Sequence, residues 1–225
     1  VYETYLKDTG ANIYLSVIPD KNCFLAAENG YPAMDYDRFF ALMREKVDFA
    51  QFVDLTDTLS LESYYRTDLH WRQEALLPTA QALADAMGVS LSESFDEVTL
   101  DAPFYGVYRG QSALPMVPDK LAYLTNSALE GCRVYDYESG EYLPVYTLDK
   151  AGGSDPYEIF LSGPKSLLRI ENPNAKTERK LIVFRDSFGA SLIPLLAEGY
   201  REITLIDIRY LSPASLGRFV AVSYT

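Results

Sequence analysis

Short apolar runs alternate with segments of helical period over the first quarter of the chain. Residues 12–18 are rich in β-forming types and end at the turn cluster 19–22, which predicts a strand followed by a polar loop. Apolar residues then recur at near-helical spacing over 39–50, and Asp35 is placed to cap that helix. A second apolar run follows at 52–55. This strand–helix–strand order predicts a right-handed βαβ unit with parallel strands.

The next part of the chain contains one stretch without a regular period. Residues 56–61 predict a short helix, whereas residues 64–71 read as a loop because neither helical nor strand spacing fits them. Helical spacing returns over 72–87. Pro78 either kinks this helix or marks its true first turn, and Gly88 is placed to end it.

Residues 90–178 have a different pattern, in which tyrosine, glycine and proline are frequent. Short alternating pieces such as 132–137 predict small β-hairpins. We interpret this stretch as an irregular, β-containing insertion or lid within one α/β domain that spans residues 1–225.

The strand and helix alternation returns at residue 180. Residues 180–184 predict a strand, 187–196 a helix and 203–208 another strand, and residues 219–222 predict the start of one more strand. Alternating strands and helices are typical of an α/β fold whose parallel sheet is covered by helices.

Composition and charge narrow the class of protein. The chain has 225 residues, of which 48% are hydrophobic and 23% are charged, and this describes a folded domain. Its net charge of −12 argues against nucleic acid or an anionic membrane surface as the partner. No apolar run approaches the roughly 18 residues that a membrane span needs. The sequence contains no signal peptide and begins at Val1, which leaves room for an upstream targeting or anchoring segment.

The two cysteines do not decide the redox environment. Cys23 and Cys132 could form one disulfide or remain free, and they lack the spacing of a CxxC motif. Because the chain has a single histidine to join them, we expect no metal site, and nothing in the sequence requires a cofactor.

His70, the single histidine, carries the candidate chemistry. Its imidazole is the side chain that changes charge near neutral pH without perturbation. Asp68 lies two positions before it, close enough for a turn to bring the carboxylate to the ring. Ser187 follows the predicted strand 180–184, at the point where a helix begins. A serine needs an adjacent base, and a carboxylate that binds the base fixes its tautomer, so these residues predict a catalytic triad.

The backbone at the serine completes this interpretation. The N–H groups of Ser187 and Phe188 are expected to point toward a developing oxyanion, and Gly189 permits close approach of an acyl group. The structural alternatives remain open, because a lone histidine is more often structural than catalytic. Ser187 and Asp68 could each simply cap the helix that follows it.

Two motifs resemble a known family. Residues 65–71 (Tyr-Arg-Thr-Asp-Leu-His-Trp) resemble the Tyr-Arg-Thr-Asp-His-His-Trp signature of the bacterial DHHW proteins, with Leu69 in place of the first histidine. Residues 180–194 resemble the strand–serine–helix segment of the same proteins, and residues 104–106 resemble a short element of theirs. DHHW proteins are similar to the alginate O-acetylation proteins AlgJ and AlgX, within the wider SGNH hydrolase group.

The resemblance implies both a fold and an activity. The implied fold is a flavodoxin-like SGNH-hydrolase-type three-layer sandwich with a parallel sheet. The implied activity is O-acetyl transfer to, or esterase action on, a cell-surface or secreted polysaccharide through an acetyl-serine intermediate. On this reading the catalytic residues are Asp68, His70 and Ser187. The alternative is an inactive polysaccharide-binding or scaffold subunit of an acetylation complex.

The same resemblance implies where the protein works and with what. It implies a location outside the cytoplasmic membrane, held there by an N-terminal anchor. The expected partners are a polysaccharide or acetylated glycan and a membrane-bound O-acyltransferase, with no nucleic acid.

Several residues beside the two motifs are auxiliary or substrate-binding candidates. Arg66 and Arg185 could hold a carboxylate, an acyl oxygen or each other's loop, and a structural ion pair with Asp186 or another neighbour is at least as strong an alternative. Trp71 is expected to pack under the loop rather than to bind sugar. The remaining candidates, Tyr65 and Phe188, directly flank the motif residues.

Overall fold

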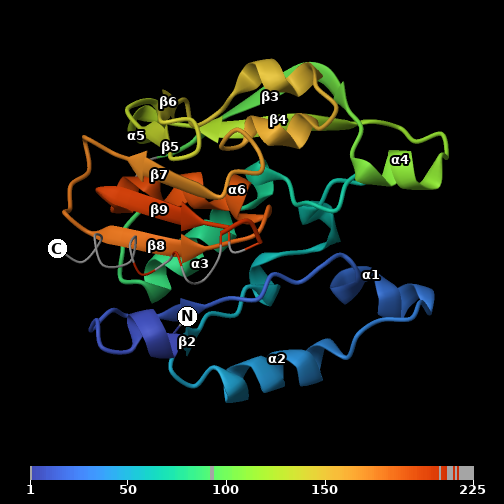
Figure 1. Ribbon diagram of the computed structural model, residues 1–225. Coiled ribbons are helices and arrows are strands. Elements are labelled where there is room, and N and C mark those ends of the chain that lie inside the picture. Colours follow the sequence, from blue (N-terminus) through green and yellow to red (C-terminus); the bar gives the residue numbers. More distant parts are fainter. Residues whose placement is uncertain (1, 92–93, 208, 212–214, 216, 218–225) are drawn as a thin grey trace.

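The computed structural model describes residues 2–91, 94–207, 209–211, 215 and 217. Its centre is a five-stranded sheet in the spatial order β6-β5-β7-β9-β8, drawn in yellow to red in Figure 1. Strands β8 and β9 run parallel, and every other neighbouring pair in this sheet is antiparallel. The strands are β5 (Arg133–Asp136), β6 (Glu141–Leu143), β7 (Leu167–Glu171), β8 (Lys180–Phe184) and β9 (Glu202–Ile206).

Two smaller sheets lie on opposite sides of the large one. Strands β1 (Tyr14–Leu15) and β2 (Gln51–Phe52) form a short parallel pair. Strands β3 (Asp96–Phe104) and β4 (Asp119–Thr125) form an antiparallel hairpin whose register shifts between Thr99 and Pro103. Figure 1 shows this hairpin above the large sheet and the first two helices below it.

The helices are short, and several are 3₁₀ turns. The α-helices are α1 (Asn22–Asn29), α2 (Tyr36–Lys46), α3 (Leu77–Ala86), α4 (Val107–Ser112), α5 (Ser127–Glu130) and α6 (Gly189–Leu192). A π-helical turn η1 (Tyr2–Leu6) precedes them, and 3₁₀ turns are η2 (Thr56–Thr58), η3 (Leu61–Ser63), η4 (Gln73–Ala75), η5 (Leu148–Gly152), η6 (Pro156–Ile159) and η7 (Ile193–Gly199).

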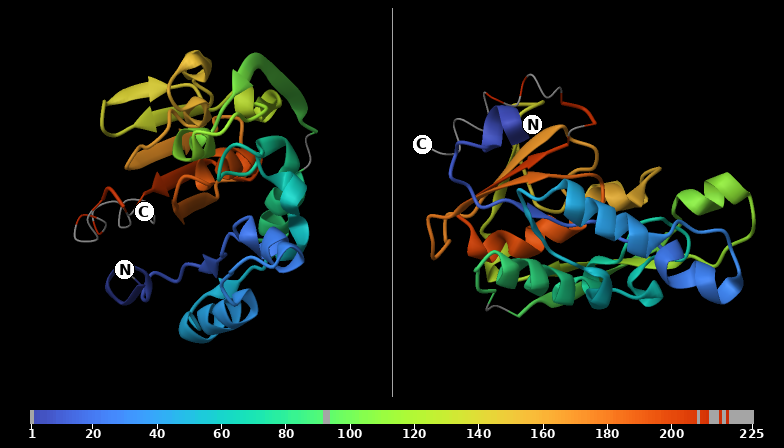
Figure 2. Two further views of the ribbon diagram at one scale, coloured as in Figure 1. Left: turned by 90° about the vertical axis from the view of Figure 1, so that its right-hand side faces the viewer. Right: turned by 90° about the horizontal axis from the view of Figure 1, so that it is seen from below.

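The main core lies between the large sheet and the helical layer of α3, α5 and η7. Leu168 of β7 and Leu205 of β9 pack there against Leu195 of η7 and Ala84 of α3. A second cluster joins the candidate loop to the β3–β4 hairpin and to η6, and Tyr65 belongs to it. Figure 2 shows the hairpin and the large sheet as separate layers of one body.

The predicted α/β class is confirmed, but the flavodoxin-like sandwich with a parallel sheet is not what the structure contains. The large sheet is mixed, since only β8 and β9 are parallel within it. A parallel pair needs a long crossover, usually a helix. The four-residue turn 137–140 joins β5 to β6 instead, so these strands pair antiparallel.

Several predicted elements are confirmed in kind and differ in length. Helix α2 begins after Asp35, whose side chain accepts a hydrogen bond from the Arg38 N–H. Pro78 lies in the first turn of α3, and Gly88 follows its end in the left-handed conformation at φ 63°. The helix expected over 187–196 begins at Gly189 and continues as the 3₁₀ turn η7.

One helix was not predicted, and one predicted strand lies where the structure gives no description. The sequence did not predict α1, because residues 19–22 read as a turn that continues into a loop. The strand expected at 219–222 lies outside the described residues.

The stretch proposed as an insertion or lid, residues 90–178, contributes to two layers of the fold. It supplies the β3–β4 hairpin, and it also supplies β5, β6 and β7 of the large sheet. The main sheet therefore depends on this stretch.

Two further expectations concern the cysteines and the membrane. Cys23 and Cys132 are both free thiols in the structure. Burial raises the pKa of Cys132 to about 12, which keeps that thiol protonated and unreactive. In the part of the chain that the structure describes, no helix has the length and apolar character needed to cross a bilayer.

The position of Leu168 at the centre of the main core gives a stability prediction. Leu168 is fully buried between strand neighbours on β5 and β9. Leu168→Ala should lower the free energy of unfolding by about 2–5 kcal/mol, because it removes apolar burial and leaves a cavity. Urea denaturation measures this change. The matched control is Leu114→Ala, at a side chain that is 61% exposed, and an equal loss in both variants would contradict the assigned core.

Candidate active site

Residues 64–71 fold into a closed loop. Tyr64 and Trp71 form an isolated antiparallel bridge at its base. Inside this bridge the Tyr65 N–H donates to the His70 carbonyl at 3.1 Å. The loop therefore turns back on itself, which brings the two candidate residues at its tip next to each other.

Asp68 and His70 are in contact through side chain and backbone. The Asp68 Oδ1 atom lies 2.6 Å from His70 Nδ1 and accepts the His70 backbone N–H at 2.9 Å. The second carboxylate oxygen, Oδ2, accepts the Val107 N–H at 2.9 Å. With its carboxylate on Nδ1, the imidazole presents Nε2 as the free basic nitrogen.

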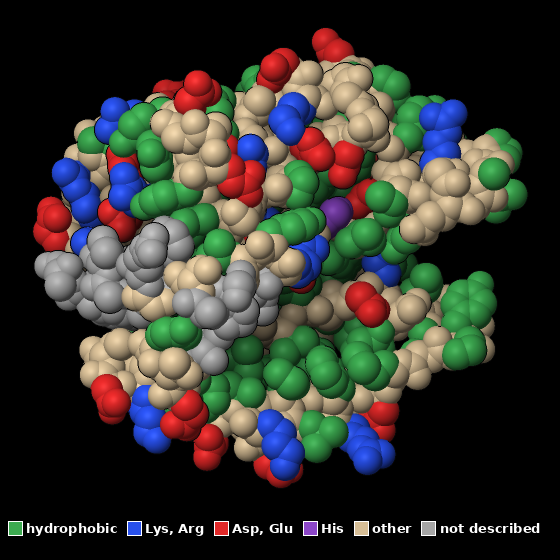
Figure 3. Space-filling view, in the orientation of Figure 1, with side chains coloured by type: hydrophobic (Ala, Val, Ile, Leu, Met, Phe, Trp, Pro, Cys, Tyr) green, Lys and Arg blue, Asp and Glu red, His purple; other side chains and the backbone are tan. Residues whose placement is uncertain are grey.

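Ser187 reaches that nitrogen from the other half of the chain. It lies in the turn between β8 and α6, and its Oγ is 2.8 Å from His70 Nε2. The two residues are 117 positions apart in sequence. The structure thus joins a hydroxyl, an imidazole and a carboxylate in one hydrogen-bonded chain. Figure 3 shows the histidine, in purple, at the surface of a hollow between the upper and lower parts of the molecule.

The buried Asp68 carboxylate stays ionised because it is fully hydrogen-bonded. Burial on its own would raise the pKa of Asp68. The hydrogen bonds from the His70 ring, the His70 N–H and the Val107 N–H outweigh burial and lower the pKa below its ordinary value. An ionised carboxylate at this position stabilises a positive imidazole.

The backbone donors at the serine differ from the prediction. The Phe188 N–H donates to the Asp186 side chain at 3.0 Å, because that aspartate forms an Asx turn around the serine. It is therefore not aimed at an oxyanion. The Ser187 N–H has no hydrogen-bond partner among the described residues, so it is the remaining backbone donor next to the hydroxyl.

Aromatic rings fix the orientation of the imidazole. Tyr157 stacks on His70 with ring centroids 3.9 Å apart and planes 10° from parallel. Phe188 lies against the imidazole at 4.9 Å in a tilted arrangement. The buried tyrosine is held by a 2.7 Å hydrogen bond to Ser191. Nothing in the sequence near Tyr157 marks this role, because the contact is formed only by folding.

Trp71 packs under the loop, as its expected structural role requires. Its indole N–H donates to the Phe188 carbonyl at 3.1 Å and to the Ser191 hydroxyl at 2.9 Å. Both partners belong to the segment that carries Ser187. The fully buried indole therefore fixes the serine turn relative to the histidine loop.

Lys21 is a site residue that the sequence did not reveal. It precedes α1, and its ammonium group donates hydrogen bonds to the Tyr65 and Asp68 carbonyls. The same group lies 4.7 Å from the centre of the Tyr108 ring. Burial lowers the pKa of Lys21, and the charges of Asp68 and Asp119 partly oppose that effect. Lys21 thus attaches the N-terminal segment to the loop.

Asp119 holds the opposite side of the loop. The carboxylate of this buried residue at the start of β4 accepts the Arg66 N–H at 3.1 Å and the Thr67 N–H at 2.7 Å. It also accepts the Thr67 hydroxyl at 2.7 Å. The orphan donors at the tip of the loop are therefore satisfied by one side chain.

Gly106 allows the β3–α4 connection to lie directly on Asp68. A Cβ atom at Gly106 would be 2.2 Å from the Asp68 Cβ, so no larger residue fits without displacing the aspartate. The adjacent Val107 supplies the hydrogen bond to the same carboxylate. The resemblance at residues 104–106 pointed to this element without giving its role.

Of the auxiliary candidates, Tyr65 and Arg185 are buried, whereas Arg66 is exposed. Tyr65 is fully buried and contacts the Phe104 ring at 4.7 Å, so it does not face a ligand in this conformation. Arg185 is buried too, donates to the Lys165 carbonyl at 3.2 Å and lies 3.8 Å from the Asp207 carboxylate. Burial lowers the pKa of Arg185, an effect that Asp207 partly opposes.

Arg66, by contrast, is an exposed residue of the loop. Its side chain is 71% exposed, with Nε 3.7 Å from Asp119 Oδ1. It is thus free to contact a ligand that the loop approaches. No group of three metal-binding side chains lies close enough together to hold an ion in the described parts of the chain.

A serine, an imidazole and a carboxylate in this order of contact are the arrangement used by serine-dependent hydrolases and acyltransferases. Comparisons of the sequence find no family profile and no curated protein that matches it. Comparisons of the structure do find similar folds. A DHHW family protein from Eubacterium siraeum is 22% identical, with 96% of this chain and 76% of that chain covered and a TM-score of 0.79.

Bacillus cereus PatB1 has a similar fold in two structures. The structure with a sulfonyl adduct is 15% identical with a TM-score of 0.74, and the other is 17% identical with a TM-score of 0.75. Each match covers 96% of this chain and 80% of that chain. The O-acetyltransferase domain of Pseudomonas putida AlgJ is 17% identical over 89% of this chain and 63% of its own, and its TM-score of 0.48 is too low to support a comparison. The chain thus resembles DHHW proteins in its fold as well as in its motifs.

The role of Lys21 in holding the loop gives a testable prediction. Lys21→Met should lower the free energy of unfolding by about 1–3 kcal/mol, because two enclosed carbonyls lose a charged donor. The measurement is urea denaturation, with hydrogen exchange of residues 65–70 as a local readout. The matched control is Lys46→Met, since Lys46 is exposed and pairs only with its neighbour Glu45 in the described structure. Similar losses in both variants would refute this role.

The lowered pKa of Asp68 predicts how stability depends on pH. Its contribution is complete above the ordinary value of 3.8 and is lost as pH falls through the lower folded value. The free energy of unfolding should therefore fall below about pH 4, with about 1.4 kcal/mol contributed by each unit of lowering. Asp68→Asn should show a shallower dependence in that window. The exposed Asp101→Asn variant is the control, and parallel curves for wild type and Asp68→Asn would contradict the prediction.

Proposed function

We propose that this chain is a serine-dependent O-acetyltransferase or acetylesterase that acts on a cell-surface or secreted polysaccharide. The observation that carries the proposal is the continuous contact from Ser187 Oγ to His70 Nε2 at 2.8 Å and from His70 Nδ1 to Asp68 at 2.6 Å. In this proposal Ser187 is the nucleophile, His70 the general base and Asp68 the residue that orients and stabilises the imidazole.

The first half-reaction forms an acetyl-serine. Ser187 Oγ attacks the carbonyl carbon of an acetyl ester while its proton passes to His70 Nε2. The tetrahedral intermediate collapses, the ester C–O bond breaks, and the leaving alcohol takes the proton back from Nε2. The negative Asp68 carboxylate stabilises the imidazolium in between.

The second half-reaction uses the same histidine. A glycan hydroxyl gives its proton to His70 Nε2 and attacks the acetyl-serine, which releases Ser187 as it regains that proton. Water in place of the glycan hydroxyl makes the net reaction ester hydrolysis. The Ser187 N–H is the donor we assign to the oxyanion in both steps.

One protein with a similar fold reacts with a sulfonyl reagent, which is compatible with the proposed nucleophile. A sulfonyl reagent attaches to an activated nucleophile, and PatB1, whose fold is similar, has been solved with a sulfonyl adduct. The sequence motifs support a polysaccharide or acetylated glycan as substrate. We further propose, from the motif resemblance, a location at the outer face of the cytoplasmic membrane or on the cell surface, with a membrane-bound O-acyltransferase as a partner.

One observation favours the alternative of an inactive polysaccharide-binding or scaffold subunit. The Phe188 N–H, one of the two expected oxyanion donors, is occupied by Asp186. Loss of one such donor costs roughly 10²–10³ in rate where it has been measured. The two functions therefore differ in the reactivity of Ser187, which can be measured.

A covalent serine probe tests the proposed function. A fluorophosphonate should label the wild type stoichiometrically and should not label Ser187→Ala, because a phosphonyl group bonds to an activated hydroxyl. His70→Gln should slow labelling by roughly 10²–10⁴-fold, since the chain has no second histidine to accept the proton. Intact-mass spectrometry measures both, with the exposed Ser112→Ala as the control. An unlabelled, folded wild type would favour the scaffold function.

A second measurement separates transfer from hydrolysis. With p-nitrophenyl acetate as donor, a transferase forms an acetylated saccharide when an oligosaccharide acceptor is added, whereas an esterase releases acetate with or without it. Mass spectrometry of the acceptor distinguishes the two.

A further inference from the structure

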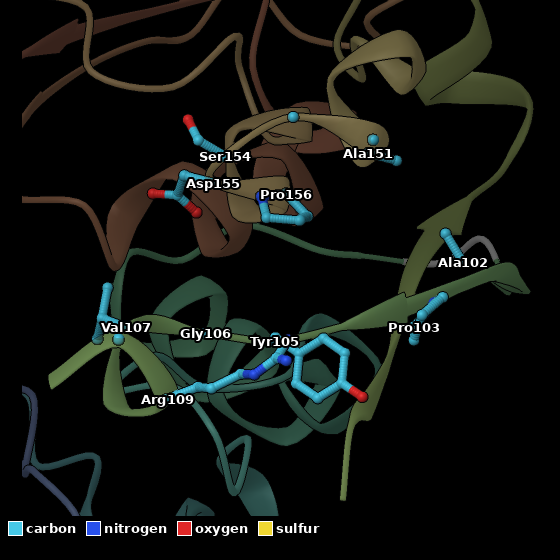
Figure 4. A pocket seen from close by; sticks show the side chains of 13 residues that line it. Ala102, Pro103, Tyr105, Gly106, Val107, Arg109, Ala151, Ser154, Asp155 and Pro156 are labelled. Atoms are coloured by element: carbon cyan, nitrogen blue, oxygen red, sulfur yellow. The ribbon is translucent and has the colours of Figure 1, made fainter. Parts of the chain in front are cut away.

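A cavity of about 680 Å³ lies between two segments that also contact the triad. One wall is formed by the end of β3 and the start of α4, and the other by residues 151–156. Figure 4 shows Tyr105, Val107 and Arg109 on one side, with Ser154 and Asp155 opposite them. Pockets of roughly 300–1,000 Å³ are typical of small-ligand sites.

Both walls are continuous with the catalytic constellation. On the first wall, Val107 binds the Asp68 carboxylate and Gly106 packs on its Cβ. On the second wall, residues 155–156 lead directly to Tyr157, which stacks on His70. The cavity thus adjoins the Asp68 and His70 side of the triad, through Gly106 and Val107 on one wall and Tyr157 beyond the other.

The charged groups of the cavity come as one opposite pair. Arg109 and Asp155 are the charged residues among those that line it, and no ion pair in the described structure involves either one. The Arg109 guanidinium carbon lies over the Tyr105 ring, 3.8 Å from the ring centroid. Asp155 uses Oδ1 to accept the Tyr157 N–H at 3.1 Å, which leaves Oδ2 for a ligand.

The charges that line the cavity cancel, so the lining has no net charge that would select a charged ligand. Partial burial raises the pKa of Asp155, and the nearby carboxylates Asp68 and Glu158 raise it further. Asp68 and Glu158 do not line the cavity and already have partners, His70 and Lys150, so the lining offers a ligand one guanidinium and one carboxylate. Uncharged hydroxyls can use both groups, because they donate to a carboxylate and accept from an arginine.

We propose that this cavity is a subsite for an uncharged sugar unit of the glycan, the unit next to the one whose ester is at Ser187. Arg109 and Asp155 are its specificity-determining residues. This rests on the proposed function and narrows its substrate class to neutral rather than uronic-acid polysaccharides. The Tyr105, Ser154 and backbone groups of the cavity supply the further polar contacts that a pyranose needs.

The test compares substrates that do and do not reach the cavity. The substrates are p-nitrophenyl acetate, acetylated methyl glycosides, acetylated neutral trisaccharides of xylose, glucose and N-acetylglucosamine, and the acetylated trimer of galacturonic acid. Acetate release gives kcat/KM for each. In the wild type, at least one neutral trisaccharide should exceed its methyl glycoside by about tenfold, and the acidic trimer should gain less.

Three variants alter the cavity, and a fourth variant, at a distant surface arginine, is the control. Arg109→Met, Asp155→Asn and Gly152→Trp should each lower the ratio of trisaccharide to p-nitrophenyl acetate kcat/KM by about tenfold. A side chain fits the backbone at Gly152, because a Cβ there meets no atom within 4 Å. The control is Arg133→Met. Arg133 is an exposed residue of β5 whose guanidinium lies over the Tyr142 ring of β6, and its replacement should leave that ratio unchanged.

The outcomes separate this inference from the proposed function. A wild type that neither hydrolyses p-nitrophenyl acetate nor reacts with the fluorophosphonate contradicts the proposed function itself. A wild type that hydrolyses the small ester but gains nothing from any neutral trisaccharide overturns the subsite. A preference for the acidic trimer, or an unchanged ratio in the three variants, overturns it as well.

Discussion

The site depends on keeping one buried carboxylate ionised. Asp68 is almost completely removed from solvent, and an unpaired charge in such a place would be strongly destabilising. Three donors remove that cost, namely the His70 ring, the His70 N–H and the Val107 N–H. Each donor also has a geometric effect, because the first two fix the loop and the third fixes the β3–α4 connection. The hydrogen bonds that keep Asp68 ionised therefore also fix the conformation of the loop and of the β3–α4 connection.

The loop that carries this carboxylate is held by segments from the whole length of the chain. Lys21 binds its carbonyls, Asp119 binds its N–H groups, and Ser191 joins Trp71 to the serine turn. A loop with so many distant contacts cannot adopt its conformation until the domain has folded around it. The geometry at His70 is thus a property of the assembled domain and not of the local motif.

Features that depend on neighbouring residues could be predicted from the sequence, whereas contacts between distant segments of the fold could not. The Asp35 cap and the Gly88 stop depend on neighbouring residues, so their pattern is visible in the chain. The pairing of β5 and β7 within the main sheet depends on partners far away in sequence, and the parallel sheet was wrong for that reason. Lys21 carries no signal of its contact with the loop. The contact among Asp68, His70 and Ser187 could be predicted because their two motifs lie in short segments of the sequence, whereas sheet order does not.

The parallel stacking of Tyr157 on His70 limits how molecules can reach the imidazole. The Tyr157 phenol covers one face of the His70 ring, and Phe188 contacts the ring in a tilted arrangement. The Nδ1 atom is bound to Asp68. Among the described residues, these contacts leave the Nε2 edge beside Ser187 as the part of the ring that a hydroxyl can approach. In the reaction proposed above, departing and arriving alcohols would use that one edge in turn, so release would precede capture.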